Sequence, residues 1–372
     1  MKDYQQHTDK YFLRSKLILQ KENINPLVRY QVFVRKDIDC LMGVDTAVAF
    51  IKEHAPEAKV YSLKDGQYCA ANEPIIKIEG KVQDLIDLET VYLGHISGGL
   101  TGPLKSSTIY HNAYGIVKAA HEKPVIYFGA RHFGPENDLM ITSICKEAGF
   151  VGCSTDCGAK NWDSHGVGTV PHALILAVFA DMLEKGNGCN PSVITAELFD
   201  RHIEKIHSRV MLIDTFNTEI SDTIDCMKQL GDKVQGVRID TCGENISEGS
   251  DIAYQFMPST LLNQKYSYGN GVTISAVWAL RLALLKNGLK KTITVSSGFN
   301  PEKTAAFYEA DAIFQYMYNT PLFDNIGTGS MYPSVIMATS DIVAYYSEED
   351  KKWLEHHKVG RGENPSKRLK LV

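Results

Sequence analysis

Polar residues that could bind an anion or a metal follow successive strand-like segments, at the points where those segments end. Two of the turns, 296–298 and 327–329, are rich in glycine and serine, and their backbone N–H groups can approach phosphate oxygens. Arginine matches anions by bidentate geometry, and paired aspartates can organise Mg²⁺ around phosphates. The composite predicts a phosphorylated substrate, a second anion and Mg²⁺, bound by Arg131, Ser154, Thr155, His172, Asp214, Arg238, Asp240, Ser296, Ser297, Gly298, Gly327, Thr328 and Gly329.

Each of these features alone has an ordinary structural explanation. The serine-glycine sequence at 296–299 is common in plain strand-to-helix turns. His172 follows a proline and could be a structural histidine, and Asp214 could cap the helix that follows it. Arg238 and Asp240 lie on one face of a strand and could pair with each other. Their common position at strand ends is what favours a site.

The elements that would position these residues alternate between strand and helix from Pro124 to Ser330. Val125–Phe128 and Ile293–Ser296 are short apolar strands, and each precedes a polar loop and a helix. This alternation predicts a parallel α/β sheet or barrel. In a barrel the carboxyl ends of the strands meet at one mouth, where active sites of this fold lie. The polar residues are therefore expected to converge there.

The segments before Pro124 and after Ser347 do not show this alternation of strand and helix. Tyr30–Arg35, Ala58–Ser62 and Pro74–Glu79 predict short antiparallel strands, and Val82–Tyr92 predicts an amphipathic helix. The first part of the chain is thus expected to be α+β. The highly charged tail that starts at Ser347 is typical of a solvated segment.

The composition is that of an ordinary globular protein. The 372 residues are 44% hydrophobic and 22% charged, which excludes a disordered or collagen-like chain. The net charge of −5 argues against nucleic-acid binding, and no apolar run is long enough to span a membrane. The N-terminus lacks the apolar core of a signal peptide, and the 8 cysteines do not show the paired spacing of a zinc site. We expect a cytoplasmic protein with reduced thiols that binds neither nucleic acid nor membrane.

Short motifs along nearly the whole chain resemble those of nicotinate phosphoribosyltransferases. Between residues 128 and 329 these motifs are FGARH at 128–132, GCST at 152–155, GVGTVPHALIL at 166–176, LIDTF at 212–216, GVRIDT at 236–241, SSGF at 296–299 and DNIGTG at 324–329. The ends of the chain match through TDKYFLRSK at 8–16, VFVRK at 32–36, LETVYLG at 88–94 and KVGRGENPSKRLKLV at 358–372.

The resemblance implies a type II phosphoribosyltransferase fold. This is an N-terminal open-faced α/β sandwich, expected at 1–120 and joined by the C-terminal segment 331–372, followed by an irregular α/β barrel at 121–330. It also implies that the chain transfers a pentosyl group from 5-phosphoribosyl-1-pyrophosphate to nicotinate in NAD biosynthesis or salvage. The products are nicotinate mononucleotide and pyrophosphate. Mg²⁺, ATP as a coupled co-substrate, and a homodimer with shared active sites are further implications.

The family's base-binding positions carry over onto particular residues. Phe128 is expected to stack on the pyridine ring, with Tyr11 from a partner subunit on the other face. Arg131 is expected beside the ring, and Arg35 is a weaker candidate for contact with pyrophosphate, again from the other subunit. Ser154 occupies the position that separates users of nicotinate from users of nicotinamide. Relatives that use the amide carry an acidic residue there, which would repel a carboxylate. Thr155, the next residue, is also a candidate for substrate binding.

The phosphate and energy-coupling positions carry over in the same way. His172 matches the histidine that ATP phosphorylates. Asp214 and Asp240 are expected to face the ribose and Mg²⁺-pyrophosphate, and Arg238 to hold the base or a phosphate. The 5′-phosphate is expected in the two glycine turns, Ser296, Ser297 and Gly298 with Gly327, Thr328 and Gly329.

The chain departs from the family's pattern at several positions. His132 stands where many members have a second arginine, and Ser297 replaces a glycine. The segment 241–244 reads Thr-Cys-Gly-Glu in place of an acidic run. Some members bind zinc through C-terminal cysteines, but no cysteine follows Cys242, so we expect no zinc.

Three alternatives stay open at this point. The pyridine could be nicotinamide or quinolinate, although two carboxylates would favour a more basic pocket than these residues offer. The chain could be a non-catalytic phosphoribosyl-binding relative, although His172, Asp214 and Asp240 are all present. A phosphate-binding aldolase or isomerase barrel would need a lysine or base at a strand end, and no lysine stands among the strand-end candidates.

Overall fold

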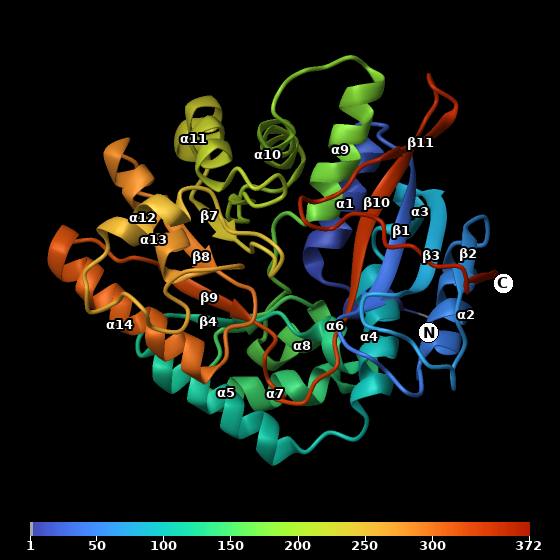
Figure 1. Ribbon diagram of the computed structural model, residues 1–372, viewed down its shortest axis with the longest axis horizontal. Helices are drawn as coiled ribbons and strands as arrows, with labels where there is room; N and C mark the ends of the chain where they lie inside the picture. The colour runs from blue at the N-terminus through green and yellow to red at the C-terminus, as the bar shows by residue number, and fades with distance from the viewer. Residues whose placement is uncertain (1–2) are drawn as a thin grey trace.

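Two six-stranded sheets organise residues 3–372, the part of the chain that the computed structural model describes (Figure 1). The first sheet is antiparallel, in the order β11-β10-β1-β3-β2-β12, and the second is parallel, in the order β5-β4-β9-β8-β7-β6. The strands are β1 (Leu27–Val34), β2 (Lys59–Ser62), β3 (Pro74–Lys81), β4 (Val125–Tyr127), β5 (Gly152–Cys153), β6 (Val210–Leu212), β7 (Gly236–Ile239), β8 (Thr292–Val295), β9 (Asn325–Thr328), β10 (Ala338–Ser347), β11 (Lys352–Glu355) and β12 (Lys370–Leu371).

The antiparallel sheet joins the two ends of the chain. β10 pairs with β1 over most of its length, and β12 closes the far edge against β2. Val28 and Val32 of β1 are fully buried, which accounts for the β-branched residues of this central strand. The helices of this part are α1 (Lys10–Lys21), α2 (Val44–His54), α3 (Val82–Leu85) and α4 (Glu89–Thr101), preceded by the short 3₁₀ helix η1 (Tyr4–His7).

The parallel strands form the irregular barrel, with helices on the outside (Figure 1). Ile239 and Val295 of the central strands are fully buried, as expected for a sheet covered on both faces. Within residues 3–372 no ladder joins β5 to β6, so the barrel is open there. Its helices are α5 (Ser106–Ala120), α6 (Ala130–Phe133), α7 (Asp138–Ala148), α8 (Asp156–Ala159), α9 (His172–Glu184), α10 (Pro191–His202), α11 (Glu219–Leu230), α12 (Ser250–Phe256), α13 (Ile274–Lys286) and α14 (Pro301–Tyr318).

One boundary differs from the sequence-based expectation. The segment Val82–Tyr92 forms two helices, because Asp87 between them is buried and accepts hydrogen bonds from Tyr4 at 2.8 Å and Lys16 at 3.0 Å. α5 lies before the predicted boundary at residue 120, yet it packs against α7 and α14 of the barrel.

The carboxyl ends of the parallel strands face the antiparallel sheet. The residues that follow β4, β7, β8 and β9 come together there with α1 and β10. No helix among residues 3–372 is long and apolar enough to cross a membrane.

Candidate active site

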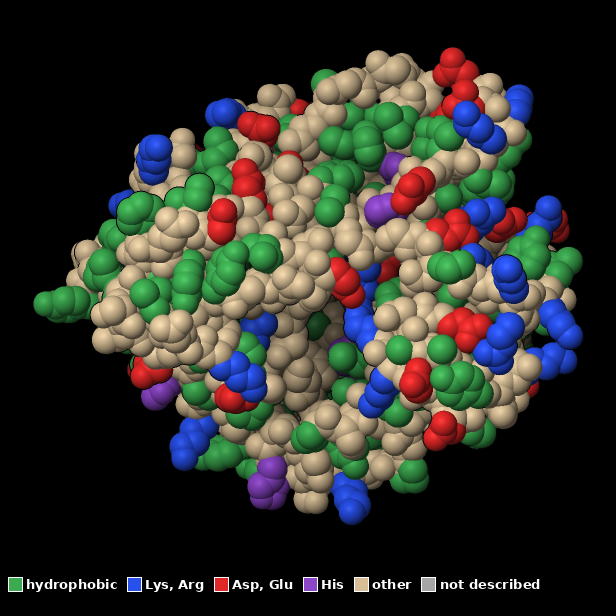
Figure 2. Space-filling view, viewed as in Figure 1, with side chains coloured by type: hydrophobic (Ala, Val, Ile, Leu, Met, Phe, Trp, Pro, Cys, Tyr) green, Lys and Arg blue, Asp and Glu red, His purple; other side chains and the backbone are tan. Residues whose placement is uncertain are grey.

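A cavity of about 460 Å³ lies between the carboxyl ends of the barrel strands and the antiparallel sheet. Figure 2 shows a hollow on this face of the molecule, with basic side chains at its edge. Most of the residues predicted from the sequence line the cavity: Tyr11, Arg35, Phe128, Arg131, His172, Arg238, Asp240, Ser296, Ser297, Gly298, Gly327, Thr328 and Gly329. Ser154, Thr155 and Asp214 are buried behind its wall.

Two aromatic rings flank one end of the cavity. The guanidinium carbon of Arg238 lies 5.9 Å from the ring centroid of Tyr11 and 5.9 Å from that of Phe128. A cation in this position is attracted to the faces of both rings. It could also form an ion pair with an anionic substituent on a third ring bound between them. This end of the cavity therefore suits a flat aromatic acid.

Tyr11 and Arg35 line the cavity of their own chain, and the expectation that they reach a partner's site stays a prediction. The N-terminal segment is fixed to its own barrel. The backbone N–H of Lys10 donates to the carbonyl oxygen of Ser154 at 2.7 Å, and Asp9 forms a β-bridge with Thr155. Tyr11, only 5% exposed, is thereby fixed beside the strand ends of the same chain.

A mixture of two variants tests this placement. Tyr11→Ala and His172→Ala are each expected to be nearly inactive in the ATP-coupled reaction, because each damages the site of its own chain. Mixed dimers made by refolding the two together are expected to recover no activity, since every site then carries one lesion. Differently tagged chains, captured together, establish that mixing occurred. Recovery of about a quarter of wild-type activity would instead mean that one site combines residues of two chains.

Arg131 is held by three side chains of the N-terminal part. It donates to the hydroxyl of Tyr11 and to Glu89 at 3.2 Å, and it lies 3.4 Å from Asp9. Burial raises the pKa of Glu89 to about 8, although Arg131 acts in the opposite direction. At neutral pH Glu89 therefore stays largely protonated, and Asp9 alone balances the charge of Arg131. This leaves Arg131 able to attract a second anion.

Glu89→Gln tests the protonation of this carboxyl through stability. The folded chain holds the proton up to a pKa of about 8, whereas the unfolded chain releases it near pH ~4.3. Between these values the folded state binds more protons, so this group's contribution to the free energy of unfolding falls as the pH rises and is constant above pH 8. The variant is expected to lack that slope in urea unfolding series across this range. Equal slopes in both proteins would contradict the assignment.

His172 sits at the first position of α9 and is part of a buried polar cluster. Lys358 reaches it from the C-terminal segment: its ammonium donates to Nε2 of His172 at 2.9 Å, to Asp214, and to the carbonyl oxygen of Asp240 at 3.1 Å. Burial and the nearby Lys358 hold the pKa of His172 well below its ordinary value. The imidazole is therefore neutral, with Nε2 carrying the lone pair and Nδ1–H donating to Thr215 at 3.0 Å.

The ammonium of Lys358 stays charged in this cluster. Burial would lower its pKa, but the carboxylates of Asp214 and Asp240 more than offset burial and raise it. Three acceptors satisfy its three protons, and the side chain is 5% exposed. Asp214 is thus an ion-pair partner of Lys358 rather than a helix cap. The pair that the sequence suggested, Arg238 and Asp240, is looser, with its charged atoms 3.6 Å apart.

The two glycine turns differ in what they can hold. Ser297 and Gly298 both have positive φ, 75° and 73°, and Lys303 of α14 donates to the carbonyl oxygen of Ser297 at 2.9 Å. Burial lowers the pKa of Lys303 to about 8, and its ammonium adds positive charge beside this turn. The turn therefore offers backbone N–H groups and a nearby cation, which suits a phosphate.

The segment 327–329, which covers the end of β9, has a packing role that the sequence did not indicate. A Cβ at Gly327 would lie 2.1 Å from the ring of Phe128, and one at Gly329 would lie 2.5 Å from the ring of His132. These glycines make room for two side chains of the cavity. His132 lies against Gly329, with Nδ1 3.2 Å from the carbonyl oxygen, and its pKa of about 4, lowered mainly by burial, leaves it neutral.

Several cavity residues were not predicted from the sequence. Lys358 and Arg361 lie in the tail that was expected to be solvated, yet their side chains are 5% and 10% exposed, so that expectation is wrong for them. The other charged lining residues that were not predicted are Asp9, Glu89 and Asp341, and Lys303 lies beside the turn at 296–298 without lining the cavity. Including the predicted ones, five cationic side chains line the cavity, against four carboxyls: Arg35, Arg131, Arg238, Lys358 and Arg361 against Asp9, Glu89, Asp240 and Asp341.

The carboxylates offer unequal places for Mg²⁺. Asp240 lines the cavity, accepts from the hydroxyl of Ser296 at 2.8 Å through one oxygen, and has its other oxygen on the side of Arg238. Asp214 has one oxygen bound by Lys358 and a second that is buried and without a hydrogen-bond partner. Carboxylate oxygens are the ligands that Mg²⁺ prefers, so Asp240 fits a phosphate-bound cation and Asp214 fits it less well.

Comparisons with known proteins agree with the motifs. Residues 9–98 match the family model described as quinolinate phosphoribosyl transferase, N-terminal domain. The nicotinate phosphoribosyltransferase pncB2 of Mycobacterium tuberculosis is 23% identical over 187 residues, which cover 49% of this chain and 36% of that protein. The match thus spans about a third of the length of this curated relative.

Two solved structures show the fold. The nicotinate phosphoribosyltransferase from Porphyromonas gingivalis aligns with a TM-score of 0.64 and 15% identity, covering 98% of this chain and 95% of that one. The nicotinate phosphoribosyltransferase from Vibrio cholerae aligns with a TM-score of 0.58 and 14% identity, covering 94% and 89%. The predicted fold class, an irregular α/β barrel with an N-terminal open-faced α/β sandwich, is confirmed.

Proposed function

We propose that this chain is a nicotinate phosphoribosyltransferase, which joins nicotinate to 5-phosphoribosyl-1-pyrophosphate and yields nicotinate mononucleotide and pyrophosphate. The observation that carries the proposal is the cavity itself. It places an aromatic pair with Arg238 at one end and the turn at 296–298 beside the cluster of His172, Lys358 and Asp240. The fold and the activities for which the similar proteins are named support it.

The residues would act by positioning and by charge. Phe128 and Tyr11 would hold the pyridine ring so that its nitrogen faces C1 of the ribose, and Arg238 with Arg131 would attract the carboxylate. The ring nitrogen is an adequate nucleophile, so no general base is needed. As the bond to pyrophosphate breaks, the cations Arg35, Lys358 and Arg361 on the wall would stabilise the negative leaving group. Mg²⁺, held through Asp240, would neutralise further charge on it.

His172 would couple the transfer to ATP. A phosphoryl acceptor needs a free lone pair, and the neutral imidazole has one at Nε2, which Lys358 now faces. The residue opens α9, so a phosphate on it would meet free backbone N–H groups and the positive end of the helix dipole. The ammonium of Lys358, which now donates to this lone pair, would then donate to the phosphate oxygens. Because Lys358 lines the cavity, phosphorylation of His172 would affect the binding of the second substrate there.

Ser154→Asp is expected to lower kcat/KM for nicotinate at least about tenfold relative to nicotinamide. The hydroxyl of Ser154 is buried without a hydrogen-bond partner, and its backbone is tied to the segment that carries Tyr11. An added carboxylate there would repel that of nicotinate. Ser154→Asn adds similar volume without charge and serves as the control. The ratio of kcat/KM for nicotinate to kcat/KM for nicotinamide is measured in the wild type and in both variants. An unchanged ratio in Ser154→Asp would contradict the proposed preference for nicotinate.

One assay tests the proposal as a whole. The purified chain is incubated with 5-phosphoribosyl-1-pyrophosphate, Mg²⁺ and one pyridine at a time, with and without ATP, and the mononucleotide is identified by mass. Nicotinate is expected to react and ATP to increase the yield. Quinolinate is the second candidate, because the N-terminal match carries that name and five cationic side chains line the cavity. Turnover of quinolinate but not nicotinate would replace the first proposal by the second.

A further inference from the structure

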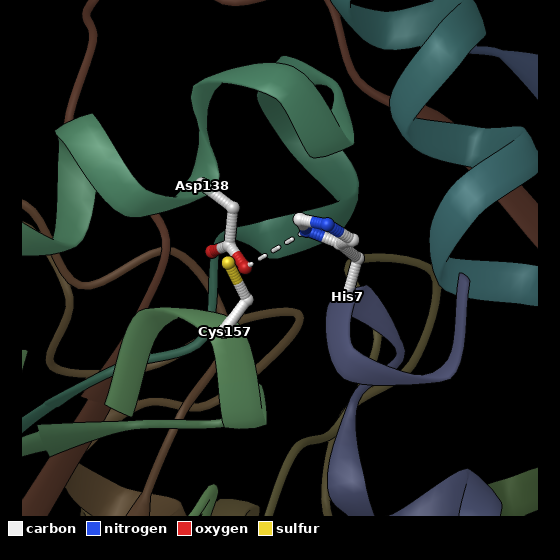
Figure 3. Close-up of side chains that lie close together, drawn as sticks. All are labelled: His7, Asp138 and Cys157. Carbon is white, nitrogen blue, oxygen red and sulfur yellow. Dashed lines mark ion pairs between the residues drawn. The ribbon is translucent and has the colours of Figure 1, made fainter. Parts of the chain in front are cut away.

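Three side chains of different types meet outside the cavity, where the N-terminal segment crosses the barrel (Figure 3). His7 ends η1, Asp138 begins α7, and Cys157 lies in α8. One ligand atom from each lies within 4.8 Å of the other two, and Nδ1 of His7 is 3.7 Å from Oδ2 of Asp138. Figure 3 shows the imidazole and the thiol both turned toward this carboxylate. None of the three lines the cavity.

Two atoms of the cluster are buried and without a hydrogen-bond partner. They are Nδ1 of His7 and Oδ1 of Asp138, and the Asp138 side chain is only 1% exposed. Leaving such atoms unpaired away from water costs free energy, and native proteins seldom do so. The unpaired atoms therefore point to a ligand that is positively charged and accepts lone pairs.

The orientation of the carboxylate is fixed from behind. Thr155 donates its hydroxyl proton to Oδ2 of Asp138 at 2.7 Å, and the backbone N–H of Gly158 donates to the Thr155 oxygen at 3.1 Å. Metal-binding carboxylates are commonly held by such outer hydrogen bonds. Thr155, which was predicted from the sequence to bind substrate, thus supports this cluster.

We propose that His7, Asp138 and Cys157 bind a divalent cation of the zinc class. Imidazole nitrogen, carboxylate oxygen and thiolate sulfur are together the ligands of zinc, whereas a thiolate disfavours Mg²⁺ and Ca²⁺. A carboxylate and a thiolate balance a charge of +2, with the histidine neutral. Bonds of about 2.0–2.1 Å in a tetrahedron place two such ligands about 3.4 Å apart. The 3.7 Å between His7 and Asp138 requires only a small closure to reach that spacing.

The site would fasten the N-terminal segment to the barrel. His7 precedes Asp9 and Tyr11, while Cys157 follows the Ser154–Thr155 pair to which Asp9 and Lys10 are bound. Three protein ligands leave a fourth position for water, which His7 allows because its side chain is 16% exposed. The proposal departs from the expectation of no zinc, which concerned C-terminal cysteines, and it does not depend on the proposed function.

Cobalt substitution tests the site directly. Purified full-length protein is stripped with a chelator, dialysed against Co²⁺, and measured for cobalt content and for the near-ultraviolet charge-transfer band that a thiolate ligand produces. The wild type is expected to bind one equivalent of Co²⁺ and to show the charge-transfer band. Cys157→Ser and His7→Gln are expected to lose the band or to bind at least about tenfold more weakly. Cys226→Ser, which changes another buried cysteine, is expected to behave as the wild type.

A second measurement covers the case in which a variant does not fold. Zinc is expected to raise the Tm of stripped wild-type protein, and to leave that of His7→Gln unchanged. A wild type without a charge-transfer band, or a band that persists in Cys157→Ser, would overturn the proposal. So would an equal shift in Tm for the wild type and His7→Gln. None of these outcomes depends on transferase activity, so the failure of this site and that of the proposed function are distinguishable.

Discussion

Lys358→Met is expected to reduce kcat/KM for mononucleotide formation at least about a hundredfold and to lower the free energy of unfolding by about 3–5 kcal/mol. The ammonium of Lys358 joins His172, Asp214 and the backbone of Asp240. Its loss leaves the carboxylate of Asp214, which is 1% exposed, without an opposite charge. A buried charge whose partner has been removed is far more costly than a pair in which both members are absent.

The double variant Lys358→Met with Asp214→Asn separates the two effects. Both charges are then removed, so most of the lost stability is expected to return. Activity is expected to stay low, because the leaving group and His172 still lack their cation. Denaturant unfolding gives the first quantity and steady-state kinetics the second. A single variant with the stability of the wild type would show that Asp214 does not depend on Lys358.

The strand-end residues could be predicted because their positions follow from local patterns. Parallel strands place their carboxyl ends on one side of the sheet, so Arg131, Arg238 and Asp240 had to converge once the strands were identified. Lys358 and Arg361 carry no such signal. They follow β11 in a charged segment, and only the pairing of β10 with β1 brings that segment over the barrel mouth.

Packing contacts between segments distant in the sequence also could not be predicted from local patterns. The glycines at 327 and 329 suggested a phosphate turn, but the rings of Phe128 and His132 occupy the space that side chains would need. The place of Tyr11 at the cavity of its own chain was not foreseen for a related reason. No periodicity indicates that Lys10 bonds to Ser154 of the same chain.

His172→Ala is expected to abolish ATP hydrolysis by the chain while a slow, uncoupled transfer to nicotinate persists. The histidine contributes a lone pair to phosphoryl transfer, but it does not contact the rings at the other end of the cavity, Tyr11 and Phe128, that would hold nicotinate. The pKa of His172 lies well below its ordinary value, first because of burial and then because of Lys358. The residue is therefore already neutral at the pH of the assay, and labelling is expected not to fall between about pH 8 and pH 6.

Labelling with ATP that carries a radioactive γ-phosphate measures this step directly. The wild type is expected to hold an acid-labile, base-stable phosphate, as phosphohistidine does, and His172→Ala to hold none. His132→Ala is the matched control, because His132 lines the same cavity but contacts Gly329 and not Lys358. It is expected to keep the label. If ATP hydrolysis survives in His172→Ala, or if the label disappears in His132→Ala alone, the phosphoryl group is carried by a residue other than His172.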